Sequence, residues 1–376
     1  MKVYFDNAAT TPLDPEVFTA MTPYLLGNFG NPSSHHSHGR EAKAALEFCR
    51  KTIAGLLNAE PEEIIFTSGG TEADNTAILS AVRGHYVNHV ITTRFEHHAV
   101  LHTLAALQKI GEIKVHFINH DNKGNLDLNH LEYLLQENPH SLVSVMHANN
   151  EIGNLNDIET IGELCEQYKA LFHTDTVQTI GHYVHDLQKL KVHFLTASAH
   201  KFHGPKGVGF LYIRKGIKTA QLLHGGAQER RLRAGTENIP GIVGLTKALQ
   251  IAYSEITDHQ RRVQEIKSAL QRRLLDILPD VQFNGNSADA ARSLYTVLSI
   301  SIPSVNYDVL RCLDEQQIAV SGGSACASGS ASHVIQALGG QPGRDTIRFS
   351  FSKFNTLQEV DYVAEKLAAI YQAVAA

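Results

Sequence analysis

The sequence predicts an α/β fold in which a doubly wound large domain, built on a mainly parallel sheet, carries a smaller α+β domain. Strand-like apolar runs alternate with helical stretches from Ile64 to Ile213, and this alternation is typical of a mainly parallel sheet. The 376 residues can also bury a large core, and a chain of this length commonly splits into two domains. We expect the strands of the large sheet at residues 64–66, 90–92, 115–118, 142–146, 171–174, 194–196 and 209–213.

Local signals predict the elements around this sheet. Asp14 followed by Pro15 predicts a helix start, because aspartate caps helix N-termini and proline suits the first helical position. A stretch rich in Glu, Gln, Arg and Leu, from about residue 240 to 275, is expected to form one long helix that links the domains. Strand-like runs at 294–302, 318–320 and 347–350 then alternate with helical runs. We therefore expect a large domain at 15–255 and a small domain formed by 1–14 and 256–376.

Composition narrows the functional classes. A net charge of −5 gives no electrostatic reason to expect nucleic acid binding. The start of the chain leaves no room for a signal peptide, and no apolar run reaches membrane-spanning length, so a cytoplasmic protein without a membrane partner is expected. Four cysteines without paired spacing argue against a disulfide framework.

Lys201 stands between a polar cluster and a glycine-rich turn that leads into a strand. An ammonium group at its ordinary pKa is not nucleophilic, so a lysine that forms a Schiff base needs partial desolvation and a fixed geometry. Small neighbours such as Gly204 leave room for a flat cofactor, while Ser198 and His200 offer hydrogen bonds to an anion. The alternative interpretation is a surface lysine in a turn.

Two further motifs suit the same cofactor. Asp175 follows an apolar strand, where a carboxylate can keep a pyridine nitrogen protonated, although a helix N-cap would use the same residue type. Residues 66–73 run from a strand through Gly69 and Gly70 into a helical stretch, and backbone N–H groups at a helix start can bind phosphate.

A loop of glycine and serine surrounds Cys326. These residues bury little and lose much entropy on ordering, so the segment is predicted to be a mobile loop that carries a thiol. An unperturbed thiol with a pKa of about 8.5 is mostly protonated at neutral pH, so a nucleophilic role needs local activation. The alternative is an inert free cysteine, but Cys49, Cys165 and Cys312 lie among apolar residues as structural cysteines do.

Together these motifs resemble the pyridoxal-phosphate-dependent cysteine desulfurases of the NifS/IscS type, within the class-V aminotransferase family. The resemblance runs from about Tyr4 to the end of the chain and implies the fold type I of pyridoxal-phosphate-dependent transferases, with a three-layer large domain. It rests on ordered segments at residues 6–12, 67–75, 146–153, 172–178, 198–212, 233–238 and 321–326.

The resemblance implies roles for individual residues. Lys201 would hold pyridoxal 5′-phosphate, Asp175 would pair with its pyridine nitrogen, and Gln178 would donate to its phenolic oxygen. His97 would stack on the ring and take part in proton transfer, while its neighbour His98 has no role in the family. The phosphate would be held by Gly70, Thr71, Ser198, His200 and, across a dimer interface, Thr236.

The same resemblance implies the substrate and the products. Asn149 and Arg348 would orient the substrate carboxylate, with Asn149 also at the cofactor, and a guanidinium suits such a planar anion. L-Cysteine would become L-alanine, and the thiolate of Cys326 would take the sulfur as a persulfide. Expected partners are a second copy of the chain and a sulfur acceptor such as an IscU- or NifU-like scaffold. The segment after Cys326 is shorter than is usual in the family's housekeeping members, and the chain ends soon after its last helix, so we expect weaker docking to that scaffold.

Two other functions stay open at this point. A selenocysteine lyase would use the same fold and cofactor, although Cys326 favours the desulfurase. A noncatalytic sulfur-relay adaptor could keep the fold, but it would have no need of Lys201, Asp175, His97, Gln178 and Cys326 together. The sequence leaves the sulfur's destination open, whether iron–sulfur cluster assembly or other sulfur trafficking.

The 22 histidines raise the question of a metal site, above all His35, His36 and His38. Their spacing matches no tetrahedral site with a cysteine or carboxylate supplied nearby, and exposed histidines are often simply solvated. We expect no metal there and assign these residues no role.

Overall fold

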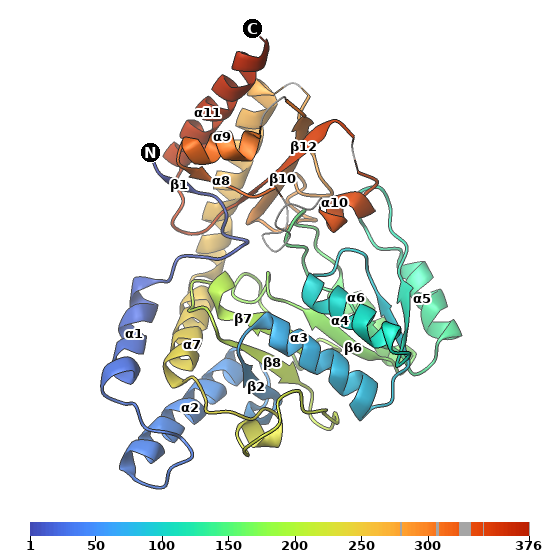
Figure 1. Cartoon of the computed structure of the whole chain (residues 1–376), viewed down its shortest axis with the longest axis vertical. Coiled ribbons are helices and arrows are strands. Elements are labelled where there is room, and N and C mark those ends of the chain that lie inside the picture. The colour runs from blue at the N-terminus through green and yellow to red at the C-terminus, as the bar shows by residue number, and fades with distance from the viewer. Residues whose placement is uncertain (279, 306–307, 323–331, 341, 376) are drawn as a thin grey trace.

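The computed structural model describes residues 1–278, 280–305, 308–322, 332–340 and 342–375. Within these residues the largest sheet has seven strands in the order β2-β8-β7-β6-β5-β3-β4 (Figure 1). All seven predicted runs form strands of this sheet, with ends that shift by at most two residues. The strands are β2 (Ile64–Thr67), β3 (His89–Thr92), β4 (Lys114–Phe117), β5 (Leu142–Ser144), β6 (Leu171–Asp175), β7 (Phe194–Ser198) and β8 (Gly209–Ile213).

The sheet is parallel except for β8, which runs antiparallel to both β2 and β7. The prediction of a mainly parallel sheet is therefore confirmed. Because β8 reverses between them, β2 points the same way as β7, and the carboxyl ends of β2, β3, β5, β6 and β7 meet at one edge. Open α/β sheets bind ligands at this edge.

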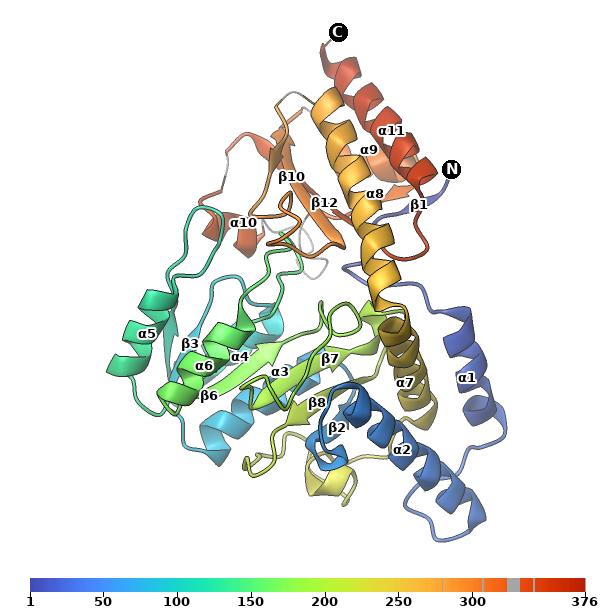
Figure 2. The ribbon, with the colours of Figure 1, turned by 180° about the vertical axis from the view of Figure 1, so that it is seen from behind.

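Helices cover both faces of the sheet and make three layers (Figure 2). Alternate strand residues point to opposite faces: Ile64 and Phe66 contact one set of helices, and Ile65 contacts the other. The first face packs against α2 (Ser37–Leu56), α5 (Leu128–Glu137), α6 (Ile158–Gln167) and α7 (Ile239–Ser254), and the second against α3 (Gly70–Leu79) and α4 (His98–Lys109). Helix α1 (Pro15–Leu26) packs on α7 and begins as predicted, since Asp14 Oδ1 accepts a hydrogen bond from Glu16 N at 2.8 Å.

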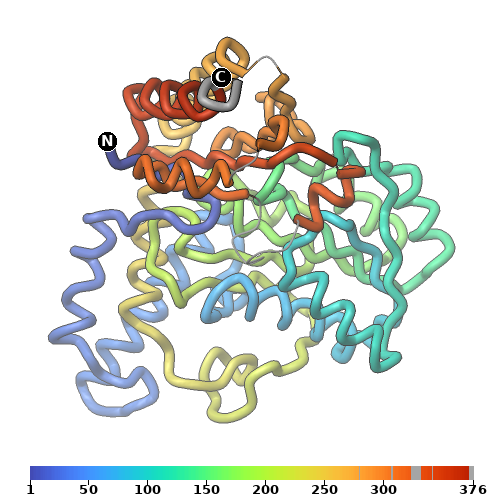
Figure 3. Tube along the Cα trace, turned by 45° about the horizontal axis from the view of Figure 1, so that its top comes forward, coloured from blue at the N-terminus to red at the C-terminus, as the bar shows by residue number. Residues whose placement is uncertain are grey.

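A second hydrophobic core lies among the C-terminal elements. The elements there are α8 (Ile256–Ile277), β9 (Gln282–Phe283), β10 (Val297–Pro303), α9 (Val309–Glu315), β11 (Ile318–Ala319), α10 (His333–Ala337), β12 (Arg344–Ser350) and α11 (Leu357–Ala375). Strand β10 pairs antiparallel with β9 and β12, while β1 (Val3–Tyr4) pairs parallel with β11. The first residues of the chain therefore lie beside α9 and α11 (Figure 3).

The prediction of one continuous helix from about residue 240 to 275 is wrong, because this stretch forms two helices. The chain breaks at Glu255, where φ is −109° and ψ is 6°, and two helices result. The break lets α7 bury Leu245 and Leu249 in the first core while α8 turns Val263 and Leu270 into the second. The domain limits given above stay a prediction. In the described part of the chain, no helix combines the length and apolar character that crossing a membrane requires.

A buried ion pair fastens the loop between β8 and α7 to the sheet. The carboxylate of Glu229 accepts from Arg50 Nη1 and Nη2 at 2.8 and 2.7 Å and from Phe66 N at 2.8 Å. The side chains of Arg50 and Glu229 are only 2% and 1% exposed. The same loop continues to Thr236.

We expect Glu229→Gln to lower the free energy of unfolding by about 3 kcal/mol, because it leaves the Arg50 guanidinium buried without its counter-charge. Urea unfolding would measure the loss. The matched control is Glu112→Gln, which removes the solvent-exposed pair with Arg83 and should cost less than about 1 kcal/mol. Equal small losses in both variants would contradict this account of the loop.

Candidate active site

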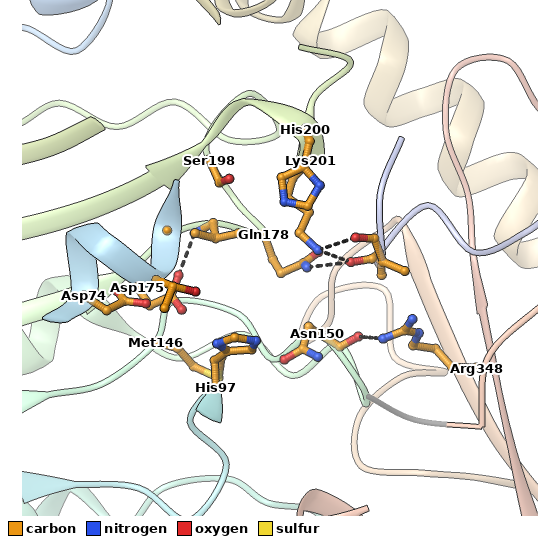
Figure 4. Close-up of a pocket in the computed structure, with 15 residues that line it drawn as sticks. Asp74, His97, Met146, Asn150, Asp175, Gln178, Ser198, His200, Lys201 and Arg348 are labelled. Atoms are coloured by element: carbon orange, nitrogen blue, oxygen red, sulfur yellow. Dashed lines mark hydrogen bonds between the residues drawn. The ribbon is translucent and has the colours of Figure 1, made fainter. Parts of the chain in front are cut away.

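A cavity of about 210 Å³ opens at the carboxyl edge of the large sheet (Figure 4). Side chains from strand ends, from the first turns of α3 and α4, from the N-terminal segment and from β12 meet there. Nine residues singled out from the sequence line it: Gly70, Thr71, His97, Asp175, Gln178, Ser198, His200, Lys201 and Arg348. The topology thus brings together residues that are almost 280 positions apart.

Lys201 stands in a short 3-10 turn directly after β7. Its Nζ donates hydrogen bonds to the carbonyls of Ala8 and Ala9, at 2.6 and 2.8 Å. Gln178 Nε2 donates to the same Ala8 carbonyl at 3.1 Å. The N-terminal segment therefore supplies the backbone oxygens that fix the lysine amine in the cavity.

The N-terminus of α3 forms one wall of the cavity. Its N-cap, Gly69, makes no side-chain capping hydrogen bond, so the first N–H groups of the helix stay available to an anion. A Cβ on Gly70 would lie 2.8 Å from Val177 Cγ2, and a Cβ on Gly209 would lie 2.3 Å from Ala197 O. A side chain at Gly70 would collide with Val177, and one at Gly209 would collide with the β7 backbone, so glycine at these positions allows the close packing around the start of α3.

Two buried acidic side chains also line the cavity. Asp175 and Asp74 both line the cavity and are 6% and 1% exposed (Figure 4). Burial, and then the like charge that Asp74 places beside it when ionised, raise the pKa of Asp175 to about 7. Burial also raises the pKa of Asp74 to about 7. Asp175 Oδ1 accepts a hydrogen bond from Val177 N at 2.8 Å and so forms a local turn. No helix begins after Asp175, so the alternative interpretation of this residue as a helix N-cap is wrong.

His97 caps α4, because its Nδ1 accepts a hydrogen bond from Ala99 N at 3.1 Å. Burial, and then the charge of Lys201, lower the pKa of His97 to about 4. The ring is therefore neutral at pH 7, and with Nδ1 occupied as an acceptor its proton is on Nε2. His200 also lines the cavity; burial lowers its pKa to about 4, and its Nδ1 lies 3.1 Å from Thr10 Oγ1.

Arg348 brings a cation from β12 to the cavity. Its Nη1 donates to Asn150 O at 2.9 Å and its Nη2 to Asp6 Oδ1 at 2.7 Å, while Nε has no hydrogen-bond partner among the described residues. The side chain is 1% exposed, so its orientation is fixed by these contacts.

Two predicted site residues, Asn149 and Thr236, do not line this cavity, and a third lies outside the described residues. The Asn149 side chain donates to Phe95 O and accepts from Glu151 N and Ile152 N, each at 2.8 Å, and its neighbour Asn150 lines the cavity instead. These hydrogen bonds hold the Asn149 side chain within the turn, and its predicted contact with cofactor and substrate stays a prediction. Thr236 is exposed on the β8–α7 loop, as a contact to a second subunit would require. Cys326 lies outside the described residues.

The sequence analysis missed several residues that line the cavity. Ala8 and Ala9 act through backbone oxygens, which no side-chain pattern reveals. Asp74 could have been predicted from the sequence, because it stands four residues after Gly70 and therefore lies on the same face of the helix. His173, beneath the cavity, could also have been predicted, because it precedes Asp175 by two residues in a strand and shares its face.

The histidines near residue 36 take part in local structure. His36 caps α2, with its Nδ1 3.2 Å from Gly39 N, and the His38 ring stacks on Phe29 at a centroid distance of 5.7 Å. No group of three or more potential ligands for a metal ion occurs within the part of the chain that the structure describes.

Comparison with known proteins decides the family. A family model described as aminotransferase class-V matches residues 3–363. The chain belongs to the class-V aminotransferases. It is also similar to the cysteine desulfurase IscS of Methanosarcina thermophila, at 43% identity over 376 residues that cover 98% of this chain and 92% of that relative.

Solved structures agree with this membership. A NifS-like protein superposes with a TM-score of 0.91 and 38% sequence identity, over 99% of this chain and 100% of the other. SspA in complex with cysteine superposes with a TM-score of 0.81 and 30% identity, over 95% and 100% of the two chains. The predicted fold class and the resemblance to NifS/IscS-type proteins are therefore confirmed.

Proposed function

We propose that this class-V aminotransferase is a cysteine desulfurase that uses pyridoxal 5′-phosphate to convert L-cysteine to L-alanine and passes the sulfur to Cys326 as a persulfide. One observation carries the proposal: a single cavity combines the Lys201 amine, the buried Asp175 carboxyl, an uncapped helix N-terminus and the Arg348 guanidinium. Relatives named cysteine desulfurase, at 42–43% identity over nearly the whole chain, support the reaction class.

The residues present fit this cofactor. Its phosphate suits the start of α3, where the N-cap Gly69 and the first residue Gly70 carry no side chain and where Thr71, Ser198 and His200 add polar groups. A protonated pyridine nitrogen suits Asp175, whose buried carboxylate has no cation bonded to it among the described residues. Gln178 Nε2 is the donor available to the ring's phenolic oxygen.

When bound, pyridoxal phosphate would supply an aldehyde for the lysine amine and an electron sink that makes the α-carbon of the amino acid acidic. Lys201 is then the base that takes the α-proton, because it is the amine that the Ala8 and Ala9 carbonyls hold in the cavity. Arg348, steadied by Asp6, binds the substrate carboxylate through charge and hydrogen bonds.

His97 has a different part to play. As a neutral ring whose Nδ1 is already occupied, it presents Nε2–H and therefore donates a hydrogen bond at neutral pH. It cannot serve as the base while that arrangement lasts. We assign proton movement at the α-carbon to Lys201 and orientation of the bound groups to His97.

The sulfur step involves Cys326 and balances without an added oxidant. The bond between the substrate's β-carbon and its sulfur breaks, and a sulfur–sulfur bond forms with the Cys326 thiolate. The β-carbon receives a proton, so L-cysteine and a thiol become L-alanine and a persulfide. A reductant or an acceptor protein then removes the outer sulfur. Dimer formation, which would bring Thr236 of one subunit to the site of the other, and docking of an IscU- or NifU-like acceptor belong to this proposal.

The first test measures both products. The wild-type enzyme, loaded with pyridoxal phosphate and given L-cysteine and a thiol reductant, should release alanine and sulfide in equal amounts. L-Selenocysteine, assayed in parallel, tests the selenocysteine lyase alternative, which predicts turnover of selenocysteine but not of cysteine. A protein that releases neither product and takes up no cofactor would favour the noncatalytic adaptor.

A further inference from the structure

The face of the large sheet beneath α3 carries a chain of polar side chains that the reaction described so far does not use. Strand register puts them on one face: Ser144 is the cross-strand partner of His173, and Thr196 is the partner of Asp175. His173 Nδ1 lies 2.9 Å from Ser144 Oγ, and its Nε2 lies 3.3 Å from Thr196 Oγ1. Asp74 reaches this row from α3, with its Oδ1 3.3 Å from His173 Nε2.

The contacts decide which carboxyl of the pair holds a proton. Asp175 Oδ1 accepts a backbone hydrogen bond from Val177, and the nearby Lys201 cation favours its charged form. A side-chain hydrogen bond with Thr196 favours the charged form of Asp74, but Oδ1, which lies 3.3 Å from His173, makes no hydrogen bond within the described residues. An unpartnered carboxylate oxygen in a 1%-exposed side chain is costly, and a neutral carboxyl is far less so.

His173 does not neutralise Asp74 by charge. Its side chain is fully buried, and burial lowers its pKa to about 4, so the ring is neutral at pH 7. Glu96 is the other acid that faces this group; burial raises its pKa to about 8, with Asp175 and Asp74 adding to the rise. With His97 also neutral, Lys201 is a cation whose charge acts on Asp175, and no such effect is found for Asp74 among the described groups.

We propose that Asp74 is a positioning residue for Asp175, holding the proton of the pair so that the site presents a single negative charge to a protonated pyridine ring. This inference rests on the proposed function for the ring itself. In this proposal Asp74 acts through Asp175. If both carboxyls were ionised, one protonated pyridine ring could neutralise only one of them, and the other would remain a buried unpaired charge. It also predicts that a permanently neutral, isosteric side chain can replace Asp74.

The test uses the cofactor-free protein first. A carboxyl whose pKa is raised on folding stabilises the fold below its unfolded value of 3.8, and that contribution is lost as pH rises through about 7. Buried histidines such as His97, His173 and His200, whose pKa values are lowered to about 4, change stability in the opposite direction up to their unfolded value of 6.5. These histidines are common to all variants, so the quantity to measure is the melting temperature of each variant minus that of the wild type at the same pH. Asp74→Asn should gain stability relative to the wild type as pH rises from 5 to 8, because it removes one titrating group and the like charge beside Asp175.

Matched variants separate coupling from simple damage. Asp175→Asn should show the same relative gain with rising pH, since either amide breaks the pair, and it tests the coupling even if Asp74→Asn does not fold. Ser144→Ala removes the hydroxyl 2.9 Å from His173 Nδ1 but keeps both acids and the hydrogen bond of Asp74 with Thr196, so its difference from the wild type should not change with pH. A difference from the wild type that stays constant with pH in both amide variants would overturn the proposal.

Pyridoxal phosphate binding to the apoenzyme, followed by fluorescence quenching, supplies the second readout. Asp74→Asn should bind about as tightly as the wild type at pH 7, whereas Asp175→Asn should lose affinity. Equal losses in both variants would overturn the assignment of the proton to Asp74. If the wild type itself binds no pyridoxal phosphate, the proposed function fails, while the stability profiles still decide whether the two acids are coupled.

Discussion

Lys201→Ala should abolish alanine formation from L-cysteine, with a fall on the order of 10³-fold or more, because the change removes both the amine that holds the cofactor and the base at the α-carbon. Treatment of the wild type with borohydride in the presence of pyridoxal phosphate should attach the cofactor covalently to the peptide that contains residue 201. Mass spectrometry of the variant should find no such attachment.

Lys206→Ala is the matched control for this experiment. Lys206 stands in the same glycine-rich turn but is exposed and does not line the cavity. Its removal should change neither the alanine rate nor the site of attachment. Attachment at a lysine other than 201, or full activity of Lys201→Ala, would remove the basis for the proposed function.

Cys326→Ala should keep bound cofactor and lose sulfide release from L-cysteine by at least ~10²-fold, because the sulfur then has no thiolate to receive it. The measurement is sulfide and alanine together, since both fall if the persulfide step is required. Cys312→Ala, in α9, removes a partly exposed free thiol and serves as the control with wild-type rates.

The same variant separates the desulfurase from the lyase. Selenium leaves carbon more readily than sulfur, so Cys326→Ala should retain more turnover with L-selenocysteine than with L-cysteine. Undiminished turnover of L-cysteine by Cys326→Ala would show that this thiol is not the sulfur acceptor, and the selenocysteine lyase would become the better interpretation.

Local sequence patterns were enough to place the strands of the large sheet, but not their directions. A buried strand such as residues 209–213 is apolar whichever way it runs, so the antiparallel β8 leaves no trace in its pattern. The break at Glu255 could not be predicted either, because no glycine or proline marks it. The two helices differ in the hydrophobic core against which each one packs, which local sequence does not show.

The candidate site shows a similar limit. Residues next to strand ends, such as Asp175 and Lys201, could be predicted because strand ends gather at one edge. The choice between Asn149 and Asn150 could not, since adjacent asparagines differ only in how the turn points them. The ion pair of Asp6 with Arg348 joins positions 342 residues apart, and no local pattern predicts such a contact.

The same long-range contacts bear on how the protein is made. Ala8 and Ala9 carry the carbonyls that hold Lys201, and they are kept in place through Ser350, whose Oγ accepts from Ala8 N at 2.8 Å and whose backbone oxygen accepts from Asn7 Nδ2 at 2.9 Å. A chain still on the ribosome, with its last 30 residues in the exit tunnel, lacks both Arg348 and this support. Such a nascent chain can fold its large sheet, yet it cannot complete the cavity. A product that stops before Ser350 should therefore be unable to generate reactive sulfur.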